Sequence, residues 1–332
     1  MDHENVKVLK ISHEAFDPSE VTKMVLFKSR DAVLHISFVL NLPQHPGQDK
    51  ILIFKIVDSQ PELAKELTLS SKVNSICVGA AIQNSGYEIS KQFYADNSYY
   101  IDVADTNLDS NPLMDFHDDF GLENEEAAKE KEPEFLVIQT MDKKLSKVPV
   151  ADGQDIAEML EMPTLCSQIQ AAHISGSECI IGFNQQQMRL YINDKIFSNE
   201  CTSFHVSQTF LSFINSTQGL SHELFNYDLN KQLPKPTGTS AGGADLPQHP
   251  RLDESGNFNI RAVERGSKIV TVDPGTRTVL QMPRGNLEGI HPRIILLKKL
   301  IEDIENLNYG KAFKALRQHK IDINLLYDVN PE

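Results

Sequence analysis

Tryptophan is absent from the 332 residues of this chain, and cysteine is rare. Without tryptophan, the tryptophan–aspartate dipeptide of WD repeats cannot occur in its literal form. The four cysteines lie at wide and irregular spacings, at positions Cys77, Cys166, Cys179 and Cys201. This spacing gives neither a paired zinc-binding motif nor a disulfide framework. A reducing, intracellular compartment is therefore the simpler interpretation.

Basic residues and long apolar runs are also scarce. The chain has 46 acidic and 32 basic residues, which gives a formal net charge of −14. This sign argues against a general surface for nucleic acids or anionic membranes. No segment approaches the roughly 18 to 20 consecutive apolar residues of a membrane helix, so no membrane contact is expected. Residues 1–10 are polar and charged, unlike a signal peptide.

The motifs that often carry catalysis are missing as well. The sequence has no P-loop, no glycine motif for dinucleotides, no HExxH zinc motif and no GxSxG nucleophile motif. Its eleven histidines are scattered, and His35 and His205 lie inside apolar segments, where a structural role is the preferred interpretation. We therefore predict that the chain is not an enzyme and has no catalytic, cofactor-binding or metal-binding residue.

Short apolar segments separated by turn residues dominate what is present, and this pattern is typical of a mainly β chain. A comparable strand pattern restarts between about residue 170 and about residue 204, close to the roughly 40 residues of a propeller blade. This interval favours a propeller over a sandwich or a barrel. The segments predicted as strands are 32–40, 51–57, 75–82, 135–140, 179–183, 188–192, 202–207, 210–214, 268–272 and 278–282.

Two segments interrupt this pattern. Residues 105–134 hold eleven acidic and two basic residues, and such a composition predicts a disordered acidic loop. A less favoured interpretation is an acidic docking segment for a basic partner. Residues 233–257 are rich in glycine, proline and serine, which predicts a second flexible loop.

The last part of the chain changes to helical spacing after Pro292. We predict one helix after this proline, a stop at Gly310, and a second helix over residues 311–320. Two such helices form an αα-hairpin, which is the unit of an α-solenoid. The candidate packing face of these helices consists of Ile294, Leu297, Leu300, Ile301, Ile304, Phe313 and Leu316.

A candidate structural junction lies between the last predicted strand and the first helix. Pro283 cannot donate a ladder hydrogen bond, and the following glycine and asparagine tolerate a tight turn. We expect the sheet to end at Pro283 and the helix to start a few residues later, near Pro292. For Arg284, a hydrogen-bonding contact across the junction is preferred over a ligand contact. The junction residues are Met282, Pro283, Arg284, Gly285, Asn286, Leu287 and Glu288.

Two segments around this junction carry a family resemblance. Residues 263–288 read VERGSKIVTVDPGTRTVLQMPRGNLE, and residues 325–331 read LLYDVNP. Together they resemble the Elongator complex protein 1 family, also called the IKAP family, which is the largest scaffold subunit of the Elongator complex. The good match covers roughly residues 187–332, and upstream of it only the strand pattern is similar. Relative to the family, the chain is expected to be partial.

The resemblance implies both an architecture and a function. It implies that residues 1–288 are part of the second, WD40-like β-propeller and that residues 289–332 begin a TPR-like α-solenoid. It further implies a non-catalytic scaffold in a complex that modifies carbon 5 of the wobble uridine of tRNA. The implied partners are the catalytic radical-SAM and acetyltransferase subunit and the WD40 subunit, with tRNA contacted only through the complex. The implied location is the cytoplasm, with the nucleus as a further site.

Two other functions share this architecture and stay open at this point. One is a propeller–solenoid scaffold of the vesicle-coat or ciliary-transport type, which a fold alone does not distinguish from an Elongator subunit. The other, less favoured, is a propeller enzyme with its site in the central channel.

Overall fold

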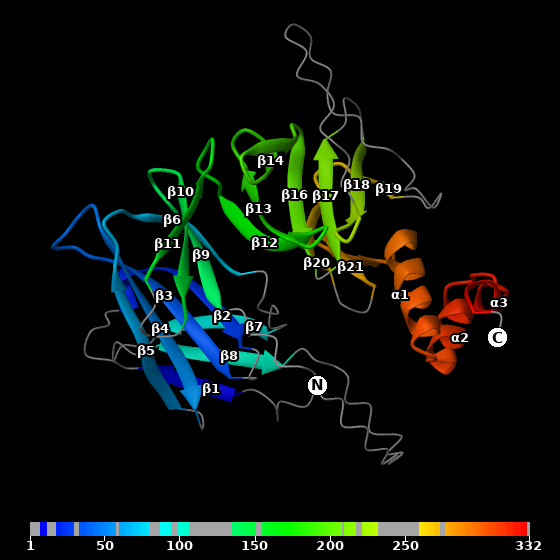
Figure 1. Ribbon diagram of the computed structural model, residues 1–332, viewed down its shortest axis with the longest axis horizontal. Helices are drawn as coiled ribbons and strands as arrows, with labels where there is room; N and C mark the ends of the chain where they lie inside the picture. The colour runs from blue at the N-terminus through cyan, green and yellow to red at the C-terminus, as the bar shows by residue number, and fades with distance from the viewer. Residues whose placement is uncertain are drawn as a thin grey trace, which may run out of the picture. The chain divides into compact units, whose positions relative to one another are not determined.

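The computed structural model describes residues 7–11, 18–29, 33–57, 60–79, 87–93, 99–105, 134–150, 155–207, 209–216, 221–231, 259–272 and 276–330. Antiparallel strands make up most of this part of the chain, and three helices follow near its C-terminal end (Figure 1). The prediction of a mainly β chain that ends in helices is thereby confirmed. The predicted loops lie outside the described residues over 106–133 and 233–257.

The chain divides into two compact units, residues 1–170 and 171–332. The boundary between them falls within strand β12 (Gln168–Ile174). The predicted division into residues 1–288 and 289–332 stays a prediction.

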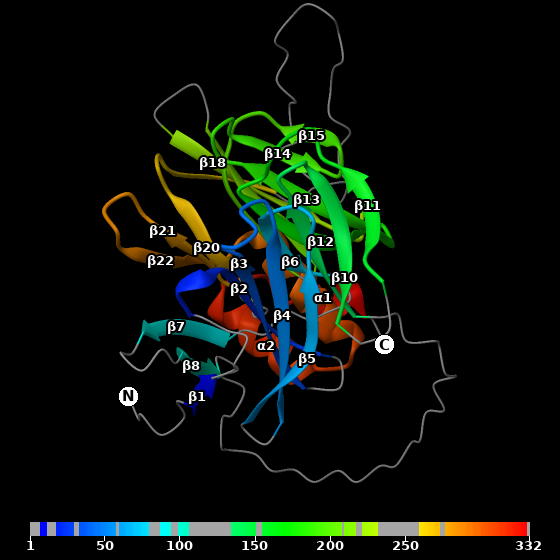
Figure 2. The same cartoon turned by 90° about the vertical axis from the view of Figure 1, so that its left-hand side faces the viewer.

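The first unit contains two four-stranded sheets, with the orders β2-β3-β4-β5 and β11-β10-β9-β6, and a three-stranded sheet, β1-β8-β7 (Figure 2). A 3₁₀ turn over Pro18–Glu20 precedes β2. The strand bounds are β1 (Lys7–Ile11), β2 (Val21–Lys28), β3 (Leu34–Asn41), β4 (Asp49–Val57), β5 (Gln60–Thr68), β6 (Val73–Val78), β7 (Tyr87–Phe93), β8 (Tyr99–Asp105), β9 (Phe135–Thr140), β10 (Lys144–Pro149) and β11 (Ala157–Glu161).

Strand β3 illustrates how burial in this unit produces a clear apolar run in the sequence. Every residue from 35 to 40 is buried, because both faces of the strand are covered. Phe38 lies in a cluster with Leu52 and Phe54, whereas Val39 lies in a second cluster with residues of β4, β6, β9 and β10. A strand that is buried on both faces reads as an unbroken apolar run, as this one does.

The second unit contains the four-stranded sheets β12-β13-β14-β15 and β16-β17-β18-β19 and the three-stranded sheet β20-β21-β22. Four-stranded antiparallel sheets whose strands follow one another in sequence are typical of propeller blades. The strand bounds are β13 (Ser177–Asn184), β14 (Arg189–Ile192), β15 (Lys195–Ser198), β16 (Cys201–Val206), β17 (Phe210–Ser216), β18 (Ser221–Asp228), β19 (Ile260–Glu264), β20 (Lys268–Val272), β21 (Thr278–Gln281) and β22 (Leu287–Ile290).

Each of the ten predicted segments overlaps a strand, but several strands were not predicted, among them the outer strands β5 and β11. Strand β5 has the sequence QPELAKELT, and strand β11 has the sequence AEMLE. These strands carry charged residues on a largely exposed face, so their apolar residues are too few to give a clear alternation. Pairing with an inner strand, rather than their own sequence, makes them strands.

The helices are α1 (Arg293–Glu305), α2 (Tyr309–Gln318) and the short α3 (Leu325–Val329). The predicted stop at Gly310 is wrong, because Gly310 lies in the first turn of α2. Helix α1 ends instead at Glu305, and the residue that stops it is Leu307, which has a φ of 61°. The amide of Leu307 donates to the Ile304 carbonyl, and that of Asn308 donates to the Asp303 carbonyl. This is the Schellman pattern that ends many helices, here without the usual glycine.

Candidate interaction site at the blade-to-helix junction

The predicted junction residues form the tip of a β-hairpin that joins β21 to β22. The amide of Gly285 donates to the carbonyl of Met282 over 2.8 Å, and the amide of Met282 donates to the carbonyl of Asn286 over 2.8 Å. Pro283 occupies the first corner of this turn, and Gly285 has a φ of 87°, which glycine adopts without strain. The expectation that the sheet ends at Pro283 is therefore wrong, because the chain turns back into β22.

Met282 is the buried member of this group. It packs with Ile214, Leu224 and Leu280 beneath the hairpin, whereas residues 283–288 are exposed. Among the described residues, the Arg284 side chain forms no hydrogen bond, so the structure does not show the predicted contact across the junction. Any functional role of the hairpin tip stays a prediction.

The actual passage from sheet to helix takes two residues, His291 and Pro292. Pro292 is the N-cap residue of α1, and its carbonyl accepts a hydrogen bond from the Leu296 amide over 3.0 Å. The His291 ring lies 4.6 Å from the His319 ring, between ring centroids, and its Nδ1 lies 3.2 Å from the Thr276 hydroxyl. These contacts fix the short connection against both the last sheet and the end of α2.

The first turn of α1 packs directly on the blades. Ile294 and Ile295 are buried against Phe210 of β17 and Val272 of β20. One turn further along the helix, Lys298 Nζ lies 3.6 Å from an oxygen of the buried Asp228 carboxylate at the end of β18. Apolar packing and an ion pair on the same helix hold α1 in one direction relative to the β16–β19 blade.

Sequence reasoning did not find this ion pair. Asp228 and Lys298 are separated by seventy positions, and each is an ordinary charged residue in its local context. Only the fold brings the end of β18 beside α1. The other carboxylate oxygen of Asp228 accepts a hydrogen bond from the Asn230 amide over 3.0 Å, which fixes the side chain locally.

The predicted helix-packing residues fall into four groups. Leu300, Ile304 and Leu316 are fully buried in the core between the helices, together with Leu296, Ala312 and Ile321, which the prediction omitted. Ile294 is buried against the blades instead, and Leu297 and Ile301 are half-buried. Phe313 does not share this burial, because its side chain is 41% exposed.

Several titratable groups in the sheets of the two units are partly or fully buried. Burial lowers the pKa of His205 to about 4 and raises the pKa of Cys166 to about 12. Burial also raises the pKa of Cys201. The His35 ring stacks on the Phe27 ring at 5.2 Å between centroids, and burial lowers its pKa. These shifts favour the uncharged form of each group.

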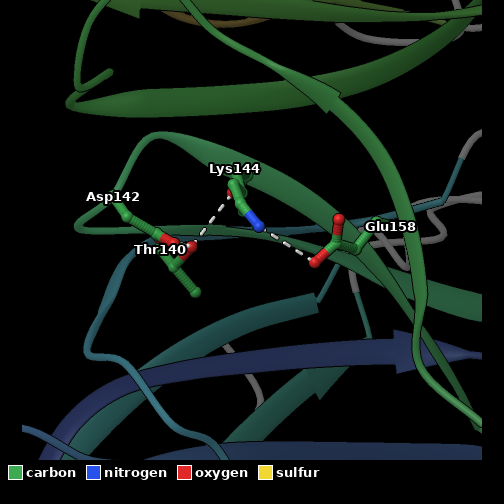
Figure 3. Close-up of polar contacts among 4 residues, drawn as sticks. All are labelled: Thr140, Asp142, Lys144 and Glu158. Atoms are coloured by element: carbon green, nitrogen blue, oxygen red, sulfur yellow. Dashed lines mark hydrogen bonds and ion pairs between the residues drawn. The ribbon is translucent and has the colours of Figure 1, made fainter.

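A cluster of polar side chains in the first unit has the composition of a functional site. It consists of Thr140, Asp142, Lys144 and Glu158 (Figure 3). The Thr140 hydroxyl is positioned to donate to the Asp142 carboxylate within the β9–β10 turn. Lys144 Nζ lies 3.1 Å from Glu158 Oε1, and the hydrogen bond between them raises the pKa of Lys144. Because both ends of this ion pair are largely exposed, it links β10 to β11 with little energetic weight.

Two kinds of feature are absent from the described residues, a metal-binding group and a membrane-spanning helix. No group of three histidine, cysteine, aspartate or glutamate side chains is placed to hold a metal ion. None of the described helices is long and apolar enough to cross a membrane.

The sequence profile of the ELP1 N-terminal second beta-propeller matches residues 24–270. The chain belongs to this family. The resemblance noted from residues 263–288 and 325–331 is thus confirmed independently by the blades upstream of them.

Curated relatives carry the name Elongator complex protein 1. The rat protein is 34% identical over 208 residues, which is 57% of this chain and 15% of that protein. The mouse protein is 33% identical over 204 residues, 56% of this chain and 14% of that protein. The Schizosaccharomyces pombe protein is 33% identical over 202 residues, 60% of this chain and 15% of that protein. The chain is partial relative to these relatives.

Proposed function

We propose that this chain is part of a non-catalytic scaffold subunit of the Elongator complex, which supports carbon-5 modification of the wobble uridine in tRNA. The observation that carries the proposal is the match of residues 24–270 to the ELP1 second propeller. The name of the relatives places them in a complex of several proteins. A scaffold needs binding surfaces that are held at fixed positions relative to one another. The packing of α1 on the blades holds the helices in this way.

The junction supports this role in a specific way. Helix α1 is held on the blades by Ile294 and Ile295 and by the Lys298–Asp228 ion pair. A helix held in this way transmits the position of the blades to whatever packs on α1, α2 and α3. We propose that these helices begin an α-solenoid, in which each helical pair stacks on the previous one.

The proposed partners are the other Elongator subunits. They are the catalytic radical-SAM and acetyltransferase subunit and the WD40 subunit, with tRNA reached only through the complex. The proposed location is the cytoplasm, with the nucleus as a further site.

The test is affinity purification of the tagged full-length product of the locus, followed by identification of the proteins that co-purify. We expect Elongator subunits, and we expect wobble-uridine modification to disappear when the gene is deleted. Recovery of vesicle-coat or ciliary-transport proteins, with modification intact, would refute the proposal in favour of another propeller–solenoid scaffold. A substrate turned over by the purified protein alone would refute its non-catalytic part.

Two charge reversals separate the role of the junction from a general effect of charge. Lys298→Glu places a second acid beside Asp228, whereas Lys299→Glu changes the neighbouring, more exposed position, which pairs with Asp303 in the same helix. In cells from which the gene is deleted, we expect the Lys298→Glu variant to restore wobble-uridine modification less well than the Lys299→Glu variant. Equal rescue by the two variants would show that a fixed α1 is not needed for function.

A further inference from the structure

Helix α2 carries a concentration of positive charge that its surroundings do not explain. Between residues 309 and 320 the chain has four cations and no acidic residue, although the whole chain has a formal net charge of −14. The four cations are all exposed, and they are Lys311, Lys314, Arg317 and Lys320.

These cations differ from those of the neighbouring helix. In α1, Lys298 pairs with Asp228, and Lys299 pairs with Asp303. Within the described part of the chain, none of the four cations between residues 309 and 320 lies within ion-pair distance of a carboxylate. Ion pairs with Asp228 and Asp303 therefore account for both lysines of α1, whereas no ion pair among the described residues accounts for the charge on α2.

The outer face of α2 also carries an exposed aromatic ring. Ala312 and Leu316 point into the helical core and are fully buried, so positions 314 and 317 lie on the outer side of the helix and position 313 lies at its border. The Phe313 side chain is 41% exposed, and the Arg317 guanidinium lies 5.9 Å from the centre of its ring. The outer face of α2 thus combines an apolar side chain with three cations on adjacent turns.

We propose that this outer face of α2 binds an acidic, amphipathic peptide segment of a partner protein. Carboxylates of the segment would pair with Lys311, Lys314 and Arg317, and an apolar side chain would cover the exposed part of Phe313. This goes beyond the proposed function, because it states the chemistry of a partner and holds whichever complex contains the chain.

Two observations favour a peptide over a nucleic acid. Affinity for nucleic acid grows with the number of phosphates neutralised, and four cations on an otherwise acidic chain neutralise few of them. In addition, Arg317 already lies over the Phe313 ring, so that face of the ring is not free to stack on a base. A short acidic segment needs only the charges present on this one helix.

The test is fluorescence anisotropy with the whole 332-residue chain and a labelled synthetic peptide of alternating glutamate and leucine. The second probe is a labelled oligouridine of about 20 nucleotides. We expect the peptide to bind more tightly than the RNA, with an affinity that falls as salt is added. Tighter binding of the oligouridine, or no binding of the peptide, would overturn the proposal.

Variants locate the binding on α2. The double variant Lys314→Glu/Arg317→Glu should weaken peptide binding by about tenfold or more, and Phe313→Ala should weaken it by several-fold. The matched control is Lys195→Glu/Lys268→Glu, which makes the same change of charge at exposed positions of two blades. Unchanged melting temperatures would show that all variants are folded. An equal loss of affinity in the control would mean that net charge, and not α2, governs binding, and the proposal would then be wrong.

Discussion

Two of the buried cores in the second unit are built from different side chains. The core around β16–β18 is aromatic: the Phe213 ring stacks on Phe225 at 5.0 Å and meets Phe197 edge-on at 5.6 Å, between ring centroids. The core between the helices contains only aliphatic side chains among its buried members, such as Leu300, Ile304 and Leu316. Both cores are fully buried, but the aromatic one is the larger of the two.

This difference teaches how the two parts are stabilised. Large aromatic side chains bury much area each and join three successive strands, so the blade holds its own shape. The short helices bury less area, and a pair of helices of this length is marginal by itself. Their position therefore depends on the packing of α1 against Phe210 and Val272.

Deletion of an aromatic ring from the blade core should have the largest effect on stability. Phe213 is fully buried, and Phe213→Ala should lower the free energy of unfolding by about 3 to 5 kcal/mol, from lost burial and the cavity left behind. Denaturant unfolding of the whole chain measures this. The control is Phe313→Ala, at an exposed position, which should change stability by less than about 1 kcal/mol. Similar shifts for both variants would contradict the comparison.

An acid placed in the helical core should act on the helices alone. Leu300 is fully buried, so Leu300→Asp should cost about 3 kcal/mol or more by introducing an unpaired charge. Hydrogen exchange followed by mass spectrometry should show lost protection over residues 293–330 and retained protection in β16–β18. Leu287→Asp, at a leucine that is 64% exposed, is the matched control. Loss of protection throughout the unit would show that the two cores unfold together.

Acidification should act through the blade. Because the folded pKa of His205 is lowered to about 4 from 6.5, the unfolded chain binds the proton first as the pH falls. Its contribution is present above the unfolded pKa and is lost between pH 6.5 and pH 4, by about 2 kcal/mol between pH 7 and pH 5. Stability measured at several pH values should show a shallower slope for His205→Gln than for the parent chain. His45→Gln, in the exposed β3–β4 turn, should keep the parent slope.

A change at the end of α1 should have the smallest effect, and its sign should be positive. Leu307 is 65% exposed and has a φ of 61°. This left-handed conformation is strained for a leucine but not for a glycine. Leu307→Gly should therefore raise the melting temperature, by a stabilisation of about 0.5 to 1 kcal/mol. Asn306→Gly, one residue earlier with a φ of −85°, should not do so. A lower melting temperature for Leu307→Gly would mean that its side chain contributes to packing.

Several features follow from local sequence. Strands β3, β4 and β9 are apolar on both faces, so their composition alone identified them. The spacing of Leu300 and Ile304 identified α1 in the same way, because residues four apart lie on one face of a helix. The segment LQMPRGNLE indicated the family resemblance from the sequence alone.

Other features were decided only by tertiary structure. The outer strands β5 and β22 have weak patterns of their own and exist because a neighbouring strand pairs with them. Residues 282–288 read equally well as a strand end or a hairpin, and pairing between β21 and β22 selected the hairpin. The Lys298–Asp228 ion pair and the exposure of Phe313 follow from which elements lie next to α1 and α2. Local spacing determines which face of an element is apolar, whereas contacts between residues distant in sequence determine what covers that face.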